Sequence, residues 1–478
     1  MSFVHRLALA TAVLLGGASL ALPADARPAG SDHHDLVLAR ESRPVTVAFT
    51  VGRPGEGLLD LVARAPGADW GVAGAEAAVV GVAVDGRDET DVVVPSARPI
   101  ARQFQLGALG RGRHVLTLTF AADRSAPRVR TAVLDRLRVR TVTGRTSDAA
   151  LAARFAPVLH GRDLAGYGGP LANATTDTPL VAWHAVTPAT LPGHRIVETS
   201  YIWSNEDGGT DTPRLMARWG RTTDIEWIYR VEVDEFGDRV PGSDTFQAPA
   251  HTTTRFAGRY EGTHAVLQTC TENNNVCDRA DDPMRFFLST QQTLPAGQPR
   301  EAVMDANPWT YQIMAAEMRR EGKIEGVASP QTAAISDQRN YLFLALDKDT
   351  SAANSGASWV GLAVGVRLRG SATVYRSDHA GTGGGTDWSI QRDDPAATTV
   401  ELPAGTGPGD IDEIVAYRVV NGAVDTGASI HATRLIRGFF LGADHLPQRS
   451  FVSGAVDTTL TPAEPSATIW RSASQLGA

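Results

Sequence analysis

The chain is predicted to be mainly β, with an N-terminal β-sandwich of jelly-roll type followed by a larger β-sandwich-type domain that contains one or two helices. Three observations lead to this prediction. Short runs of β-branched and apolar residues recur along the chain, glycine and Asp-Gly turn signals separate them, and only two segments have helical periodicity. Regular short strands joined by such turns are typical of sandwiches.

Residues 1–26 have the pattern of a cleaved export signal. A short basic start is followed by an apolar run from Leu7 to Leu22 and by Ala24-Asp-Ala26, an A-x-A cleavage site. The apolar run is long enough to suggest an uncleaved anchor as the alternative, but the small-residue site favours cleavage. No later segment has the ~20 apolar residues that a membrane helix needs. We therefore expect a secreted, extracellular protein with no transmembrane segment, and about 450 remaining residues in two to three domains.

Charge and cysteine content limit the partners and the chemistry. The formal net charge of −8 argues against nucleic acid as a partner. Almost every basic residue is arginine, which is typical of a GC-rich bacterial genome. The two cysteines, Cys270 and Cys277, are expected to form a disulfide across a tight loop in an oxidising compartment. A zinc site is less favoured because it would need further ligands nearby.

Residues 35–145 are predicted to form the accessory sandwich. Its expected strands cover residues 45–51, 78–84, 114–120 and 132–142, with a turn at Asp85-Gly86. The aromatic residues of this region are few: Trp70, Phe49, Phe104 and Phe120. Because a carbohydrate-binding face needs exposed aromatic platforms, a structural role is preferred here, and glycan binding by this domain is the alternative.

Residues 150–452 are predicted to form the main domain. A short helix over 149–155 opens it, and the clearest strands cover 196–203, 225–233, 265–269, 341–346, 363–368 and 414–419. A second helix is expected over 309–321, capped by Asp305 or Asn307, with Pro308 in its first turn and Gly322 at its end. Its buried stripe would be Trp309, Ile313, Met314 and Met318. Residues 453–478 are rich in Ala, Ser, Thr and Pro and are expected to be loosely ordered.

The candidate site lies in residues 219–234, which are expected to begin as a strand. Asp224 and Glu226 are two residues apart, so an extended backbone places both on one face, opposite Ile225 and Trp227. Two neighbouring carboxylates among aromatic residues are costly unless a metal ion, arginines or sugar hydroxyls compensate them.

Three interpretations of these carboxylates remain open. As metal ligands they would join Asp207 and Asp211 of a Gly- and Asp-rich loop, and calcium is the cation that such oxygen donors suit. As catalytic groups they would be a general acid and a base or nucleophile, with Arg221 stabilising charge and His264 as a further candidate base. As structural groups they would pair with nearby arginines.

A second polar cluster is expected where His264 and the Glu272-Asn-Asn-Asn275 loop flank one strand. The candidate ligand-binding residues of the whole region are aromatic or amide side chains: Trp203, Asn205, Trp219, Trp227 and Asn274. Neither a G-x-S-x-G elbow nor an H-E-x-x-H motif occurs, which disfavours serine-hydrolase and zincin chemistry.

Four short motifs between residues 154 and 277 resemble a known family in order and spacing. They are Arg154-Phe-Ala-Pro-Val-Leu159, Tyr201-Ile-Trp-Ser-Asn205, Asp224-Ile-Glu-Trp227 and Tyr260-Glu-Gly-Thr-His264. Together they resemble the vacuolar-protein-sorting-associated "sixty-two" family and, more remotely, the necrosis-inducing secreted proteins. The resemblance implies a β-sandwich fold, a cation-ligand role for Asp224 and Glu226, and a cytolysin-like action at lipid surfaces. The acidic and tryptophan positions are reordered here, and no histidine precedes Asp224, so we do not carry over toxicity.

Three functions follow as hypotheses. The first is a module that binds an extracellular glycan or cell-surface ligand, with calcium as its candidate cofactor. The second is a polysaccharide hydrolase or lyase, which should place the acids in a cleft lined by Trp203, Trp219 or Trp227 with one pKa raised. The third is a cytolysin-like protein with exposed apolar loops.

Overall fold

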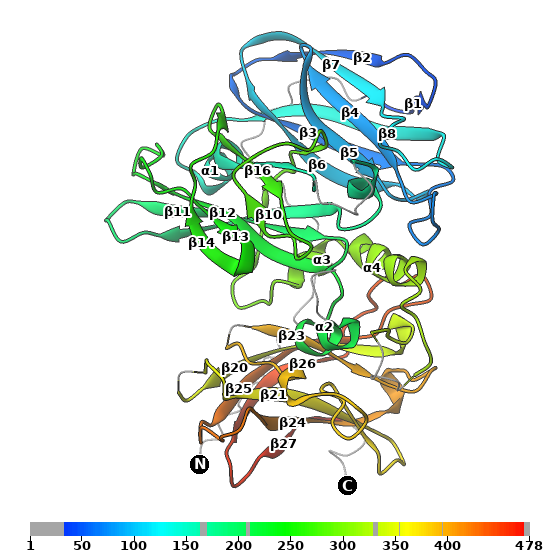
Figure 1. Cartoon of the computed structure of the whole chain (residues 1–478), viewed down its shortest axis with the longest axis vertical. Helices are drawn as coiled ribbons and strands as arrows, with labels where there is room; N and C mark the ends of the chain where they lie inside the picture. Colours follow the sequence, from blue (N-terminus) through cyan, green and yellow to red (C-terminus); the bar gives the residue numbers. More distant parts are fainter. Residues whose placement is uncertain are drawn as a thin grey trace, which may run out of the picture.

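The computed structural model describes residues 33–162, 170–206, 211–327, 333–352, 354–393 and 395–472. Three β-rich bodies follow one another along the long axis of the molecule (Figure 1). We call them the N-terminal sandwich (residues 36–142), the central region (148–320) and the C-terminal sandwich (341–471). The predicted signal sequence lies outside the described residues. Within the described part of the chain, no helix is both long and apolar enough to span a bilayer.

Two four-stranded antiparallel sheets form the N-terminal sandwich, with strand orders β1-β8-β3-β6 and β2-β7-β4-β5. Their strands are β1 (Leu36–Ala39), β2 (Val45–Val51), β3 (Gly55–Arg64), β4 (Ala78–Val84), β5 (Arg87–Val94), β6 (Ile100–Leu109), β7 (Gly112–Phe120) and β8 (Thr131–Val142). In β2, Val47, Phe49 and Val51 are buried while alternate residues face outward, as period-two patterning requires. Asp85 and Gly86 both have positive φ, so the predicted turn joins β4 to β5. The predicted sandwich is confirmed.

The central region consists of a six-stranded sheet, a smaller mixed sheet and most of the helices. The larger sheet has the order β14-β13-β12-β11-β10-β19, and the smaller one contains β15, β16, β9 and β18, with β17 paired to β16. Its elements are α1 (Asp148–Phe155), β9 (Val158–His160), η1 (Pro170–Ala174), β10 (Pro179–Pro188), β11 (Arg195–Trp203), α2 (Thr212–Trp219), β12 (Asp224–Val233), β13 (Thr245–Ala248), η2 (Pro249–His251), β14 (Thr252–Arg255), β15 (Tyr260–Glu261), β16 (His264–Thr269), β17 (Val276–Cys277), β18 (Arg285–Phe286), β19 (Gln292–Thr293), α3 (Ala302–Ala306) and α4 (Trp309–Arg320).

The two predicted helices correspond to α1 and α4. Ser147 caps α1 through its side chain, and Gly322, with φ of +68°, follows the end of α4. The expected cap of α4 is wrong: Pro308 is the N-cap residue, and Asp305 instead accepts a hydrogen bond from Tyr311. Of the expected stripe, Ile313, Met314 and Met318 are buried and Trp309 is half-buried against the same core.

The C-terminal sandwich has two four-stranded sheets of its own, ordered β23-β20-β25-β26 and β22-β21-β24-β27. Its elements are η3 (Gln338–Asn340), β20 (Tyr341–Thr350), β21 (Trp359–Leu368), β22 (Val374–Arg376), η4 (Thr386–Trp388), β23 (Ala396–Glu401), η5 (Pro408–Asp410), β24 (Ile411–Asn421), β25 (Ile430–Phe439), β26 (Val452–Leu460) and β27 (Ser466–Arg471). The expected main domain is therefore divided, because this sandwich has a separate hydrophobic core. Residues 453–471, expected to be loosely ordered, belong to β26 and β27 instead.

The N-terminal sandwich is packed tightly against the central region. Their buried apolar side chains form one continuous core. Trp70 of the sandwich donates a hydrogen bond of 2.9 Å from its indole nitrogen to Glu317 of α4, and His264 of β16 contacts Glu56 at 3.2 Å. Backbone hydrogen bonds also join β6 to the segment after β18, where Gln105 N–H donates to Phe287 O. This pairing covers the edge strand β6.

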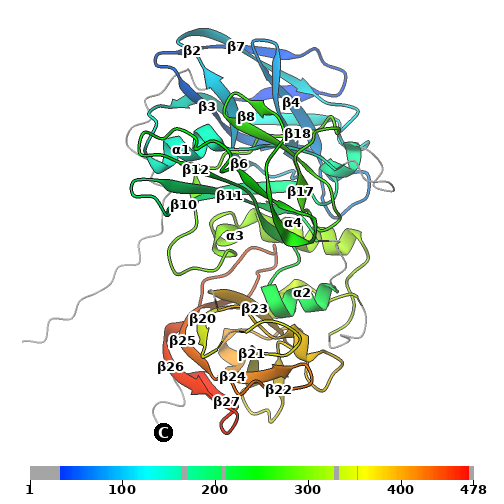
Figure 2. The same cartoon turned by 60° about the vertical axis from the view of Figure 1, so that its left-hand side comes forward.

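Helices α2, α3 and α4 lie between the central sheet and the C-terminal sandwich (Figure 2). Tyr311 of α4 packs edge-on against Phe343 and Phe439, which stack on each other with ring centroids 5.5 Å apart. Helix α2 lies against β23. The junction between these two bodies is therefore built from packed side chains of both, and the candidate site adjoins it.

Candidate functional site

Asp224 and Glu226 lie on one face of β12, as predicted. In the antiparallel register, Trp203 of β11 is opposite Asp224, and Tyr201 is opposite Glu226. Both aromatic residues are fully buried, so this face points into the protein. Asp224 is only 2 % exposed, whereas the side chain of Glu226 is 16 % exposed. We call these two residues the acidic pair; only Glu226 is within reach of solvent.

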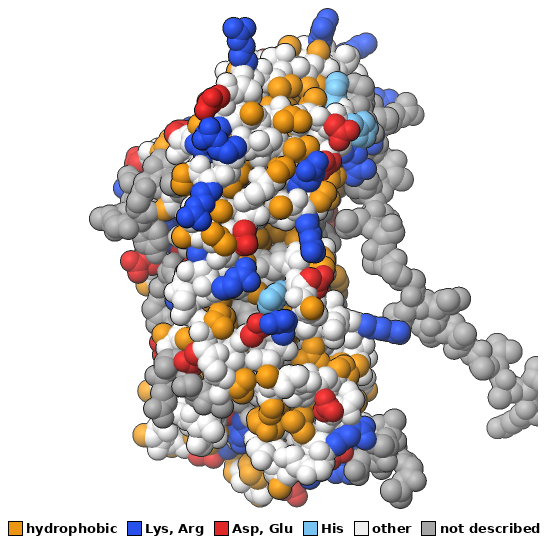
Figure 3. Space-filling view, turned by 90° about the vertical axis from the view of Figure 1, so that its right-hand side faces the viewer, with side chains coloured by type: hydrophobic (Ala, Val, Ile, Leu, Met, Phe, Trp, Pro, Cys, Tyr) orange, Lys and Arg blue, Asp and Glu red, His pale blue; other side chains and the backbone are white. Residues whose placement is uncertain are grey.

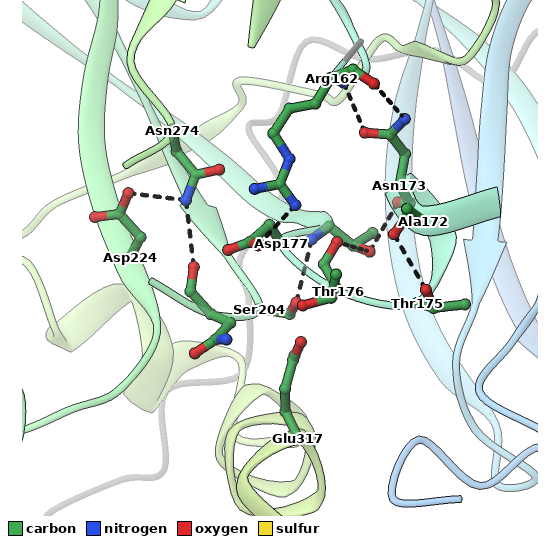
Figure 4. A network of polar contacts seen from close by, with 12 residues as sticks. Arg162, Ala172, Asn173, Thr175, Thr176, Asp177, Ser204, Asp224, Asn274 and Glu317 are labelled. Atoms are coloured by element: carbon green, nitrogen blue, oxygen red, sulfur yellow. Dashed lines mark hydrogen bonds and ion pairs between the residues drawn. The ribbon is translucent and has the colours of Figure 1, made fainter. Parts of the chain in front are cut away.

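Asn274 holds the buried member of the acidic pair in place. Its side-chain amide donates a hydrogen bond of 3.0 Å to Asp224 Oδ2 and another of 3.2 Å to the carbonyl oxygen of Asn205 (Figure 4). Asn274 itself has a positive φ of 49°, at the tip of the hairpin between β16 and β17. The same view shows a buried ion pair, Arg162 with Asp177 at 2.6 Å, on the other side of Asn274. The asparagine loop and the acidic strand, separate in the sequence, are thus one cluster.

Burial gives the acidic pair unusual acid–base properties. It raises the pKa of Asp224 from 3.8 to about 7, and the charge of Glu226 raises it further, against the opposing effects of Arg221, Asn274 and Arg300. Burial also raises the pKa of Glu226, and Arg300 is the largest opposing influence. A carboxyl with a pKa near 7 is about half protonated at neutral pH, so the pair can hold a proton where ordinary carboxyls do not.

His251 belongs to this cluster and has no signal in the sequence. Its ring nitrogen Nδ1 lies 3.8 Å from Glu226 Oε1 and 2.8 Å from the amide nitrogen of Gln247. Asn273 and Asn275 reach the same ring at 3.1 Å and 3.4 Å. Ala250 and His251 both have positive φ, and this backbone conformation positions the ring. The conformation is uncommon for residues other than glycine, so the residue types do not predict it.

A group of arginines lies next to the acidic pair, around Trp219. Arg221 is buried and forms an ion pair of 3.0 Å with Glu301. The guanidinium carbons of Arg218, Arg221, Arg300 and Arg392 lie between 4.0 and 5.8 Å from the centre of the Trp219 ring. Arg300 also donates to the backbone oxygen of Ile225, between the two acids. The arginines therefore connect the acidic pair with Trp219.

A pocket of about 330 Å³ opens beside Trp219 at the junction with the C-terminal sandwich. We call it the Trp219 pocket; its lining residues are Arg218, Trp219, Asn354, Ser355, Gln391, Arg392 and Asp393. Three separate segments contribute: the end of α2, the loop after β20 and the loop before β23. Of these lining residues, only Trp219 was a candidate ligand-binding residue from the sequence, because no local pattern links it to residues more than a hundred positions away.

The end of α2 positions Trp219 in this pocket. A helix leaves its last carbonyl groups without intrahelical partners. Here the hydroxyls of Thr398 and Thr399 on β23 donate to the carbonyls of Ala217 and Met216, and Arg392 donates to that of Arg218 at 2.6 Å. Gly220 ends the helix with a φ of +66°. Residues 219–223, expected to be strand, are therefore a helix end and a turn, and β12 starts at Asp224.

Several predicted site residues lie away from the acidic pair or are not open to a ligand. His264 is at the opposite end of β16 from the asparagine loop, with its ring between Ala156 O at 2.9 Å and Glu56. Trp203 is fully buried, and Trp227 is covered by Arg230 at 3.8 Å. Asp211 is exposed at the N-cap of α2.

The structure does not bring together the expected metal ligands. Asp207 lies outside the described residues, and across the described residues no group of three or more His, Cys, Asp and Glu side chains is placed to hold a metal ion. The acidic pair with Asn274 supplies oxygen donors of the kind that calcium takes, but only two of them are carboxylates. Calcium binding stays a prediction.

The two cysteines are adjacent free thiols, and the expected disulfide stays a prediction. They lie on the hairpin formed by β16 and β17, where Cys277 is opposite Gln268. A hydrogen bond between the thiols lowers the pKa of Cys277 to about 7 and raises that of Cys270. Arg279 further lowers the pKa of Cys277.

Comparison with known proteins places the chain in no family. No protein-family model and no curated protein matches it, so the resemblance noted from the short motifs stays untested. Among solved structures, the chain is similar to the CBM36-1 domain of a multidomain xylanase from the hindgut metagenome of Trinervitermes trinervoides, with 17% identity, 23% of this chain and 77% of that chain covered, and a TM-score of 0.19. Tandem CBM51 modules of a family 98 glycoside hydrolase from Streptococcus pneumoniae match with 11% identity, 81% and 83% coverage, and a TM-score of 0.16. At such TM-scores the likeness carries no argument about fold or ligand.

Proposed function

We propose that this protein binds a glycan in the Trp219 pocket. The observation that supports the proposal is the composition of the pocket: one half-buried tryptophan among side chains that are all polar or charged. A sugar presents apolar C–H groups and closely spaced hydroxyls, which suits an aromatic ring surrounded by hydrogen-bonding groups. The volume of about 330 Å³ is at the lower end of the range for small-ligand sites.

The walls of the pocket are held in place before any ligand arrives. Asn354 donates to the carbonyl oxygens of Val360 at 2.6 Å and Gln391 at 3.0 Å, and the side-chain amide of Gln391 donates back to Asn354 O at 2.8 Å. Lys348, fully buried, donates to Gln391 O at 3.1 Å and to Asp393 at 2.6 Å. Such preorganisation lowers the entropy that binding costs.

A glycan-binding screen with intrinsic tryptophan fluorescence tests the proposal. We expect a soluble oligosaccharide to change the emission of the wild-type protein, and Trp219→Phe to weaken that binding. Trp470→Phe is the matched control, since Trp470 is also half-buried but lies on β27. Equal affinity of wild type and Trp219→Phe for every bound saccharide would contradict the proposed location.

Polysaccharide hydrolysis is a second candidate function, favoured by one arrangement. Glu226 is reachable by solvent, has a raised pKa and lies beside His251, so it could donate a proton to a leaving group. Against this, Asp224, the carboxylate paired with Glu226 on β12, is buried and so is not accessible to a substrate. Reducing-end release from polysaccharides by the wild type, lost in Glu226→Gln, would support hydrolysis; equal release by both would exclude this mechanism.

A further inference from the structure

The Trp219 pocket contains two arginines that form no direct ion pair among the described residues. Arg218 and Arg392 both line it, and within the described part of the chain neither forms an ion pair with a carboxylate. The hydrogen bonds of Arg392 go to neutral acceptors, the carbonyl oxygens of Arg218 and Ala397. Both guanidinium groups are also partly removed from water. Their positive charge is thus not neutralised by a direct ion pair, and it is not fully hydrated.

Carboxylates lie near these arginines, but those that form ion pairs are engaged by other cations. The charges of Asp387 and Glu206 act on Arg218, and Asp387 is paired with Arg214 at 2.8 Å. Asp393, which lines the pocket, accepts a hydrogen bond of 2.6 Å from buried Lys348. Glu301, behind Trp219, is paired with Arg221 at 3.0 Å. Each acid therefore has a closer cation of its own, and Glu301 offsets the charge of Arg392 only in part.

The remaining arginines repel one another. Burial lowers the pKa of Arg392 to about 9, and although Glu301 counteracts this, the charges of Arg300, Arg221 and Arg218 lower it further. Burial and the charge of Arg214 lower the pKa of Arg218, and the charges of Asp387 and Glu206 oppose this. The arginines of the Trp219 pocket are grouped together, whereas acidic and basic side chains are interspersed on the face of the molecule shown in Figure 3. A bound anion would relieve this repulsion, because an oxyanion between guanidinium groups replaces water with charge-assisted hydrogen bonds.

We infer that the Trp219 pocket selects acidic sugars, with a ring carboxylate or sulfate accepted by Arg218 and Arg392 and the sugar ring held beside Trp219. This inference rests on the proposed function and specifies its ligand class. The shared chemistry is an oxyanion attached to a sugar; a uronate and a sulfate ester are its two sources. Planar guanidinium groups match both in geometry.

Paired ligands separate charge from sugar identity. Calorimetric titrations would compare an oligogalacturonate with its methyl ester, and a sulfated galactan oligosaccharide with the same oligosaccharide after desulfation. We expect the acidic member of at least one pair to bind at least about tenfold more tightly, the effect of one charge-assisted hydrogen bond. Added salt should lower the affinity for the acidic ligand and leave the affinity for the neutral ligand unchanged.

Two variants test the location. Arg218→Gln removes one charge. Ser355→Glu adds a negative charge at the exposed rim of the pocket without removing a structural contact. This charge repels an anion, so the affinity for the acidic ligand should fall at least about threefold. Ser453→Glu is the matched control, because Ser453 is exposed on β26, at the edge of the sheet opposite β23. It should change nothing.

Each outcome decides one proposal. Tighter binding of an acidic ligand, weakened by Ser355→Glu and Arg218→Gln but not by Ser453→Glu, supports the inference. Equal binding of acidic and neutral partners overturns it while leaving glycan binding intact. Acidic-ligand binding that neither pocket variant changes overturns the assigned location. If none of the saccharides binds, the selectivity and the proposed function both fail.

Discussion

Replacing Asp224 by Asn should stabilise the protein at neutral pH. The carboxyl of Asp224 is 2 % exposed, lies beside Glu226, and accepts a hydrogen bond from Asn274. An asparagine has the same shape and retains an oxygen that can accept this bond, so the substitution removes the ionisation without opening a cavity. The change in stability therefore reports the cost of holding a charge at this position.

The size of the effect follows from the pKa. A pKa that moves from 3.8 to about 7 on folding means that the folded protein holds a proton which the unfolded chain has released between these pH values. Stability from this group is therefore complete below about pH 4 and falls as the pH rises to 7. Each pKa unit corresponds to about 1.4 kcal/mol, so the loss approaches about 4 kcal/mol. Asp224→Asn should match the wild type near pH 4 and exceed its free energy of unfolding above pH 7 by up to that amount.

Urea unfolding at a series of pH values, monitored by tryptophan fluorescence, measures this difference. Asp85→Asn is the control of opposite sign, because the Val115 N–H and His114 lower the pKa of Asp85. The stabilisation by Asp85 should be lost as the pH falls through that lowered pKa. In Asp85→Asn, the free energy of unfolding should therefore depend less on pH at acidic pH than in the wild type. Parallel curves for wild type and Asp224→Asn between pH 4 and 8 would refute the reasoning.

Two further predictions concern buried contacts. Trp70→Phe removes the indole donor to Glu317 and should lower the free energy of unfolding by about 1–3 kcal/mol, because a buried carboxylate loses a partner. Thermal unfolding measures this loss, and an unchanged midpoint would contradict the prediction. In the reduced protein, iodoacetamide at pH 7.5 should label Cys277 before Cys270, since its pKa is lowered to about 7 and the thiolate is the reactive form. Peptide mass spectrometry identifies the labelled residue, and preferential labelling of Cys270 would show that the thiol hydrogen bond is misassigned.

Elements with a strong local pattern were predictable almost to the residue. Residues 45–51 and 78–84 were expected as strands and form β2 and β4, the first because its apolar residues alternate and the second because it is a short, continuous apolar run that ends at a turn. The helix after Pro308 was predictable because its apolar residues recur with helical periodicity. The acidic pair was also predictable, since a spacing of two in a strand places both side chains on one face.

Other features had no local signal. Helix α2 ends at Trp219 because β23 and Arg392 satisfy its carbonyl groups, and those partners are distant in sequence. His251 reaches Glu226 through a backbone state that its residue type disfavours. The division of the predicted main domain was missed because the boundary between two cores depends on which strands pair.

The amino-acid sequence by itself determined the strands with the strongest local pattern, helices α1 and α4, and the position of the acidic pair, because side-chain periodicity and turn chemistry act between near neighbours. Only the tertiary structure decided that three segments meet around Trp219, that the asparagine loop contacts Asp224, and that two arginines remain there without carboxylate partners. These features depend on strand pairing and on the docking of two cores. Such contacts stabilise the protein only after distant segments have come together, so no local pattern specifies them.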